Sequence, residues 1–502
     1  MATYVNDLRL KEIATGDESG TWGTSTNTNL ELIGEAFSVG TEALSDASTG
    51  TITVQDGTSD AARSMNMKLS GSLSQACTVT LAPNTLSKVW CIENNAGAAV
   101  TLTQGTGANV VIPNGGIRMV VADGAGSGAA ITDVLDVLGG TGNIALGSGA
   151  MGTALTTGTD NVAIGENALD AVTTGADNTA VGDNAAGAIT TGTDNVAVGS
   201  AALLVNTTGN KNTAVGLAAL TANTTAANQT AVGYASMTAN TTGTGNVAVG
   251  YQSLYTNTTG ASNTAIGYRA LKLNATTDNN TAVGIDALLA NVATENTAVG
   301  FTALTANTTG TDNVAMGAYA LDANTTGADN TAVGDNALGA NTTASNNTAV
   351  GSLALAANTT GAQNTAVGSL ALDAATTASD NTGLGYGALS AATTGTRNIA
   401  VGNSLRTLTT ANDNLAIGYD AMVASTSGTQ NVAVGNYALD ANTTGGYNVG
   451  IGFNALTANT TADYNVAVGR EALVANTTGA SNTAIGRNAL GANTTGDSNV
   501  AV

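Results

Sequence analysis

Histidine is absent from this chain, so the residue that most often acts as general base or metal ligand is not available. The two cysteines, Cys77 and Cys91, are too few for a disulfide framework or a Cys-only zinc site, and we expect them to be small buried hydrophobes. Ser, Asp and Glu occur without a partner base or a fixed pattern. We therefore expect no enzyme, no cofactor and no metal site.

Positive charge is also scarce. The chain has 13 Lys and Arg against 35 Asp and Glu, a formal net charge of −22, so it lacks the basic face that nucleic-acid binding needs. No apolar run approaches the roughly 18 to 20 residues of a membrane span, and Met1 to Lys11 lacks the apolar stretch of a secretory signal. We expect neither membrane insertion nor an export signal. Aromatic residues make up only 3%, so Ala, Val, Ile and Leu must form the core in thin layers.

What the chain does have is one short sequence unit repeated in tandem. A unit of 17 residues, Asn-Thr/Val-Ala-Val/Ile-Gly-x-x-Ala-Leu-x-Ala-Asn-Thr-Thr-Gly-x-x, recurs from Asn143 to Asn499, with two shorter copies and one longer copy. A fixed period of this kind predicts a stacked repeat architecture, here a parallel β-solenoid. Position 5 of the unit, numbered from its Asn, is Gly in every complete copy, which predicts a corner after the first strand.

Two positions of the unit are expected to form the core of the coils. Position 4 is always aliphatic, and position 9 is nearly always Leu or Met, so each should stack on its counterpart in the next coil. The predicted core residues are Val181, Leu203, Val333, Leu338, Val350 and Leu355.

Position 3 never holds a residue larger than Ala. Side chains alternate across a strand, so position 3 should face away from position 4, and its size limit suggests that another backbone lies close by. We interpret this position as the contact between three chains around a symmetry axis; the alternative is a two-layered interior within one chain. The predicted interface residues are Ala163, Ala180, Ala197, Ala214, Ala332, Ala349, Ala366, Gly383 and Gly450.

Several positions of the repeat suggest a specific function, but ordinary turn formation also explains some of them. Asn-Thr-Thr at positions 12 to 14 is a formal glycosylation sequon, but it also suits a turn, as do the recurrent Asp-Asn pairs that could otherwise bind calcium. The Thr columns suggest ice binding, although adjacent threonines need not form a flat array. Aromatic residues at position 6, such as Tyr234 and Tyr251, could stack on sugars.

The region before the repeats divides in two. Residues 1–45 form a segment in which Thr28 to Glu31 resembles a capping box and starts a short amphipathic helix, while Gly20 to Gly23 forms a loop. Residues 46–138 read as a small antiparallel β domain, and residues 139–502 form the solenoid. The segment has little core of its own, so we expect it to dock on a partner. The residues expected to carry this attachment are Leu8, Leu10, Trp22, Leu30, Ile33 and Phe37.

The repeat Asn330-Thr331-Ala332-Val333-Gly334-Asp335-Asn336-Ala337-Leu338 resembles the head repeats of trimeric autotransporter adhesins, whose coils are usually shorter. That resemblance implies a left-handed parallel β-roll in a trimer. The same repeat type occurs in bacteriophage tail fibres. The sequence from Asn6 to Gly16, with Thr21-Trp22-Gly23 and Asn29 to Leu32, is similar to the virion-attachment end of tail fibres of marine phages.

The two resemblances imply different biology. An autotransporter needs a signal peptide and a membrane barrel, whereas a phage protein leaves the cell by lysis. We therefore expect an all-β homotrimeric tail fibre on the virion, attached by its N-terminus to a tail or baseplate protein. Its shaft, at roughly 4.8 Å per coil, is on the order of 100 Å long. The host receptor would be bound by a tip beyond Val502. The alternative is a self-assembling extracellular filament or surface adhesin.

Overall fold

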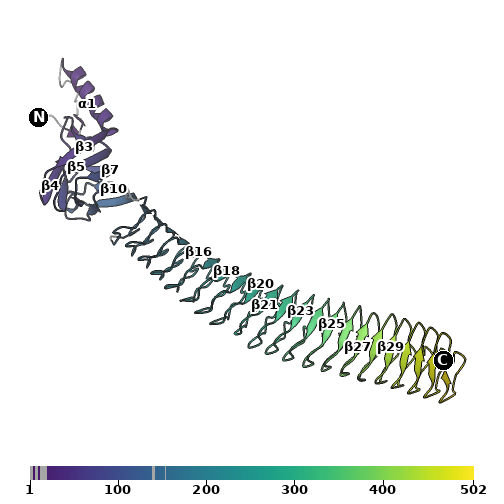
Figure 1. The fold of residues 1–502 in the computed structure, drawn as a ribbon. Helices are drawn as coiled ribbons and strands as arrows, with labels where there is room; N and C mark the ends of the chain where they lie inside the picture. Colours follow the sequence, from purple (N-terminus) through teal and green to yellow (C-terminus); the bar gives the residue numbers. More distant parts are fainter. Residues whose placement is uncertain (1–3, 6–9, 12–19, 138–141, 153) are drawn as a thin grey trace. The chain divides into compact units, whose positions relative to one another are not determined.

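The computed structural model describes residues 4–5, 10–11, 20–137, 142–152 and 154–502, which form two compact units. The first unit comprises residues 1–218 and 223–225, and the second comprises residues 219–222 and 226–502. The first contains an N-terminal β domain and the first coils, and the second contains coils only (Figure 1). The fold is all-β with very little helix, and its parallel β-solenoid has about 21 turns.

The N-terminal helix is longer than the sequence indicated. Helix α1 spans Trp22–Ala36, and Thr21 precedes it without a side-chain cap. Thr28 lies inside the helix, where its hydroxyl donates to the carbonyl of Thr24 at 3.0 Å. The predicted capping box is therefore wrong, because Thr28 bonds back along the helix as Ser and Thr often do in helix interiors. Two short strands, β1 (Tyr4–Val5) and β2 (Leu10–Lys11), pair beside it.

The N-terminal β domain consists of two facing sheets. One holds β3 (Val39–Leu44), β5 (Asn66–Gly71), β7 (Ser87–Asn95), β10 (Ile117–Asp123) and β11 (Ile131–Val137). The other holds β4 (Thr49–Thr53), β6 (Cys77–Ala82), β8 (Val100–Thr103) and β9 (Val110–Ile112). Two 3-10 turns, η1 (Ala61–Arg63) and η2 (Gly126–Gly128), complete it. Its core includes Trp90 and Cys77. Cys77 is buried as expected, whereas Cys91 is only half-buried.

Most neighbouring strands of this domain are parallel, so the prediction of an antiparallel domain is wrong. The chain alternates between the two sheets from β3 to β8, and it returns to each sheet in the same direction. Such crossovers produce parallel pairs, whereas direct hairpins produce antiparallel ones. Antiparallel pairing begins only where β8 meets β9 and where β7, β10 and β11 lie side by side.

The coils of the first unit continue one of these sheets. Strand β11 pairs antiparallel with β12, and every later pair among the coil strands of this unit is parallel. These strands are β12 (Ile144–Leu146), β13 (Val162–Ile164), β14 (Thr179–Val181), β15 (Val196–Val198) and β16 (Thr213–Val215). The N-terminal domain thus supplies the edge on which the first coil pairs.

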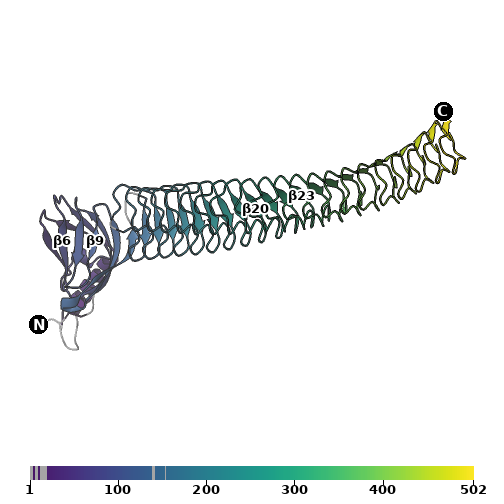
Figure 2. The same cartoon turned by 90° about the horizontal axis from the view of Figure 1, so that it is seen from below.

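The second unit repeats one short strand per coil, stacked in parallel (Figures 1 and 2). Ala332, for example, pairs with Ala349 of the next coil. The strands are β17 (Thr230–Val232), β18 (Val247–Val249), β19 (Thr264–Ile266), β20 (Thr281–Val283), β21 (Thr297–Val299), β22 (Val314–Met316), β23 (Thr331–Val333), β24 (Thr348–Val350), β25 (Thr365–Val367), β26 (Thr382–Leu384), β27 (Ile399–Val401), β28 (Leu415–Ile417), β29 (Val432–Val434), β30 (Val449–Ile451), β31 (Val466–Val468), β32 (Thr483–Ile485) and β33 (Val500–Ala501).

Position 3 faces the inside of its own coil. The alanines predicted to join three chains are instead fully buried within one chain: Ala163, Ala180, Ala197, Ala214, Ala332, Ala349 and Ala366. Gly383 and Gly450 are buried as well. A Cβ on Gly450 would lie 3.2 Å from the carbonyl oxygen of Ala455 and 3.3 Å from the Leu439 side chain. The size limit is real, but its cause is the chain's own position 9 leucine and position 8 carbonyl.

Position 4 faces outward for the same reason, since side chains alternate along a strand. Val181, Val333 and Val350 are half-buried on the outer side of their coils, so their assignment to the core is wrong. Leu203, Leu338 and Leu355 at position 9 are fully buried, and their assignment to the core is confirmed.

Two columns of asparagine lie inside the coils. At position 1, the Asn330 side-chain amide donates to Asn313 Oδ1 at 3.1 Å and to the Ala344 carbonyl at 2.9 Å, while its Oδ1 accepts from the backbone N–H of Asn347 at 3.0 Å. At position 12, Asn341 donates to the same Ala344 carbonyl at 3.0 Å. Both side chains are fully buried. A glycan on Asn341 would require this amide to leave the coil, so the sequon reading is not compatible with the fold.

The corners rely on left-handed backbone. Gly334 at position 5 has φ +137°, and Asn336 and Leu338 at positions 7 and 9 have φ near +50°. A buried Leu with positive φ is uncommon, because its Cβ crowds the backbone. Its recurrence coil after coil shows that leucine burial outweighs this local strain.

Candidate functional site

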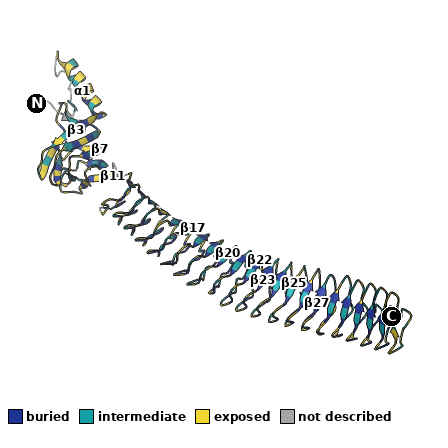
Figure 3. Cartoon of the chain, in the orientation of Figure 1, coloured by how far each residue is buried: buried dark blue, intermediate teal, exposed yellow. Residues whose placement is uncertain are grey.

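The coils of the second unit present an outer strand face made of positions 2 and 4. Along each strand the middle residue is buried and its neighbours are partly exposed, as in β23 (Figure 3). Position 2 is Thr or a branched aliphatic residue, and position 4 is aliphatic. Apart from Val502 in the last coil, at 93%, the most exposed position 4 side chains in this unit are at 37% to 45%: Ile266, Met316, Val367, Leu384, Ile417, Ile451 and Ile485.

This outer strand face is a large apolar surface for a protein with net charge −22. The aliphatic side chain at position 4 recurs in successive coils of the second unit, whereas surface hydrophobic residues of a soluble monomer are usually scattered singly. Parallel sheets are also normally covered on both faces. The face therefore has the character of an interaction surface.

The N-terminal segment exposes a second apolar patch. Leu30 of α1 is 62% exposed, and Phe37 and Val39 just after the helix are 73% and 59% exposed. Ile33 and Leu10 are half-buried, Leu8 lies outside the described residues, and nothing is described of the Trp22 side chain. Of the residues predicted for attachment, Leu30 and Phe37 are thus exposed, and Val39, which the sequence analysis did not name, is exposed as well.

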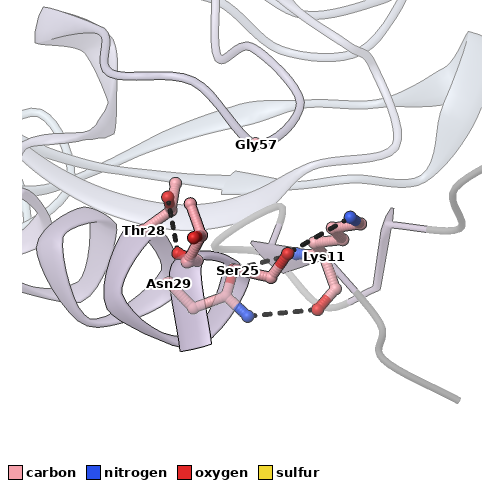
Figure 4. Close-up of a pocket in the computed structure, with 6 residues that line it drawn as sticks. Lys11, Ser25, Thr28, Asn29 and Gly57 are labelled. Atoms are coloured by element: carbon pink, nitrogen blue, oxygen red, sulfur yellow. Dashed lines mark hydrogen bonds between the residues drawn. The ribbon is translucent and has the colours of Figure 1, made fainter. Parts of the chain in front are cut away.

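A small polar pocket lies between β2 and α1 (Figure 4). Asn29 accepts from the Lys11 backbone N–H at 3.2 Å and donates to the Lys11 carbonyl at 3.1 Å, and Lys11 Nζ lies 3.3 Å from the Ser25 hydroxyl. Thr28 and Gly57 also line it. These bonds fix β2 on the helix, and we assign the pocket this structural role.

Buried cations tie α1 to the β domain. Arg63 in η1 is fully buried and donates to the carbonyls of Gln55 at 2.6 Å and Thr58 at 3.1 Å. Its Nη2 lies 3.3 Å from Asp60 and its Nε 3.9 Å from Glu35 of α1. The arginine therefore connects the base of the exposed apolar patch to the rigid domain beneath.

Lys88 gives this cluster a measurable pH response. Its ammonium donates to the Ala62 and Arg63 carbonyls and lies 5.2 Å from the Trp90 ring centroid. Burial lowers the pKa of Lys88 to about 8, with Asp60 opposing and Arg63 adding to the shift. Between about pH 8 and 10.5 the unfolded chain binds more protons than the folded one at this site, so stability contributed here rises with pH. We expect the stability of wild type relative to Lys88→Met to increase from pH 7 to pH 10 in urea unfolding of the N-terminal domain.

Lys68→Met serves as the control for this measurement. Lys68 is half-exposed and pairs with Glu93 at 3.1 Å on the surface. We expect the difference in stability between wild type and Lys68→Met to change much less between pH 7 and pH 10. If the stability difference from wild type changed equally with pH for the two variants, the burial of charge at Lys88 would be contradicted.

The described residues contain no group of three or more His, Cys, Asp or Glu that could hold a metal ion. None of the described helices is long and apolar enough to cross a membrane. Comparison with protein families, with curated proteins and with solved structures found no match to this chain. Its role must therefore be argued from the surfaces described above.

Proposed function

We propose that this chain is the structural protein of a trimeric fibre, most simply a bacteriophage tail fibre. Three copies pack through their outer strand faces, so that positions 2 and 4, rather than position 3, lie at the chain interface. The N-terminal segment attaches the fibre to the particle through Leu30, Phe37 and Val39, and the coils extend toward the host surface.

One observation carries this proposal: the outer strand face repeats an aliphatic residue at position 4, beside Thr or a branched aliphatic residue at position 2, coil after coil. A single chain leaves this face against water, which is unfavourable at about 25 cal/mol per Å² of apolar surface. Equivalent copies cover it at every coil with the same contact, as a symmetric assembly requires. The excess of acidic residues elsewhere keeps such a fibre soluble.

A charge on the outer strand face tests the assembly. We expect Val333→Glu combined with Val350→Glu to convert a trimer into monomers, measured by light scattering after size exclusion, with the circular dichroism of the coils retained. Burying these carboxylates in an apolar interface is costly, whereas in the monomer they remain in water.

The matched control places the same charges on another side of the same coils. Thr343 and Thr360 at position 14 are exposed turn residues. Thr343→Glu with Thr360→Glu should leave the trimer intact. A monomeric wild type, or a trimer that survives the Val333 and Val350 changes, would falsify the interface assignment.

Localisation is tested separately, by negative-stain imaging of infected lysate with an antibody to the repeats. Labelled fibres on virions support the tail fibre. Free filaments without particles support a self-assembling extracellular filament instead.

A further inference from the structure

A ladder of tyrosines stands on the second unit at position 6, beyond the corner glycine that ends each strand. Tyr234, Tyr251 and Tyr268 occupy successive coils and are 49%, 42% and 44% exposed. The ring centroids of each adjacent pair are 5.2 Å apart, with interplanar angles of 9° and 10°. The corner glycine at position 5 lies between the ladder and position 4 of the outer strand face.

The charge around the ladder differs from that of the whole chain. Between Asp194 and Asp278 the sequence contains no acidic residue, although the protein as a whole has net charge −22. The same stretch contains three cations, Lys211, Arg269 and Lys272. Arg269 lies 4.9 Å from the ring centroid of Tyr268 in the ladder, whereas Lys272 lies 5.8 Å from that of Tyr255, which is at position 10 and outside the ladder. The coils that carry the ladder are therefore a locally basic stretch of an acidic protein.

The geometry of the rings limits what they can bind. Tyr251 is stacked on both faces, and Tyr268 lies between Tyr251 and the Arg269 guanidinium. Their faces are thus not available for stacking on sugar rings. What remains accessible is the ring edge, which carries partial positive charge, and the phenol hydroxyl. Edges, hydroxyls and cations together favour an anionic ligand.

The far end of the ladder is closed by an ion pair. Arg269 Nε and Nη2 donate to the two carboxylate oxygens of Asp286 at 2.8 Å and 2.6 Å. This bidentate pair fixes the guanidinium against the Tyr268 ring and neutralises the nearest carboxylate. Lys272 forms no ion pair with a carboxylate among the described residues, so these coils keep a net positive charge.

We propose that the tyrosine ladder binds an extended, carboxylate-bearing polysaccharide that runs along the coils. The ladder offers one hydroxyl per coil at an even spacing comparable to the length of one sugar unit. It offers no pockets between the stacked rings, and a peptide strand would need such pockets for its alternate side chains. A regular polyanion therefore matches this surface better than an acidic peptide does. Binding would let the side of the coils contact a charged glycan layer.

The experiment uses the full chain and three immobilised polymers: sodium alginate as the carboxylated polysaccharide, poly-L-glutamate as the acidic peptide, and dextran as the neutral glycan. Biolayer interferometry should show binding to alginate that weakens as salt is raised, with little binding to the other two. Tyr234→Ser, Tyr251→Ser and Tyr268→Ser combined should weaken alginate binding about tenfold, and Lys272→Glu alone should weaken it severalfold.

A second tyrosine stack provides the matched control. Tyr447 and Tyr464 at position 17 are 4.9 Å apart, stacked at 16°, and 49% and 58% exposed, but they lie beside Asp463 rather than among cations. Tyr447→Ser with Tyr464→Ser should leave alginate binding unchanged. Circular dichroism of every variant checks that the coils are intact, and the comparison holds whatever the oligomeric state.

Each remaining outcome counts against the proposal. Absence of alginate binding by wild type overturns it, as does equal weakening by the two sets of tyrosine changes. Binding to poly-L-glutamate as tight as to alginate would assign the ladder to acidic peptides instead. Equal binding to dextran would remove the role of charge.

Discussion

Replacing Gly334 with alanine is expected to destabilise the coils by about 4 kcal/mol. Gly334 has φ +137°, a region that residues with a Cβ rarely adopt. A Cβ there would lie 2.6 Å from the carbonyl carbon and oxygen of Gly351 in the next coil. Because the next coil is backbone at this point, no side-chain rotation can relieve the contact. Urea unfolding followed by circular dichroism measures the loss.

Gly387 is the matched control for this change. It lies at position 7 with φ +60°, and a Cβ on it would come no closer than 4.0 Å, to the Ser390 hydroxyl. Other coils hold Asn at the same position in the same conformation, as at Asn336 with φ 53°. We expect Gly387→Ala to cost less than about 1 kcal/mol. Similar losses for the two variants would show that glycine flexibility, rather than the close approach of coils, sets the requirement at position 5.

The sequence was sufficient for the solenoid because its strongest signals are local. An unvarying glycine at position 5 and a leucine at position 9 fix a corner and a core residue in each coil, and stacking follows from the period. Leu338 is buried and Gly334 turns the chain, as predicted.

The sequence was not sufficient to say which side of the strand faces inward. Ala332 and Val333 are both apolar, and alternation places them on opposite sides without naming the inner one. The size limit at position 3 was visible, but its cause, contact with a leucine of the preceding coil, exists only in the folded chain. For the same reason the candidate interface moves from Ala332 to Val333.

The buried asparagines were missed because asparagine is mostly an exposed turn residue. The available signal was the near-invariance of position 1 among the repeats, since a solvated turn accepts Asp, Ser or Gly as well. The exception supports this reading: Gln229 replaces Asn and keeps the bond from its amide to the Gly243 carbonyl. An amide, rather than a polar side chain in general, is what this position requires.

The requirement for an amide leads to the second large effect. Asn330→Asp keeps the shape of the side chain but removes the N–H groups that reach Asn313 and Ala344, and it places a carboxylate where the side chain is fully buried. Each acceptor keeps one other donor, the backbone N–H of Asn330 for Asn313 and the amide of Asn341 for Ala344. The two lost bonds therefore cost about 0.5–1.5 kcal/mol each, and burying the charge adds the larger share. We expect a loss of about 4 kcal/mol at pH 7, measured by urea unfolding.

The pH dependence of the stability of Asn330→Asp shows whether position 1 requires the hydrogen bonds of an amide or only its packing. Burial raises the pKa of a carboxyl, so a folded Asp at position 330 binds a proton more tightly than the unfolded chain does, and stability is recovered as the pH falls. The protonated acid can again donate one hydrogen bond to the Ala344 carbonyl or to Asn313. Asn336→Asp is the control, since position 7 already holds Asp at Asp286 and Asp420 and is only half-buried. Two results would show instead that the two columns of asparagine stabilise the coils by packing rather than by their hydrogen bonds. One is a loss at Asn330→Asp that does not change between pH 7 and pH 4, and the other is an equal loss at Asn336→Asp.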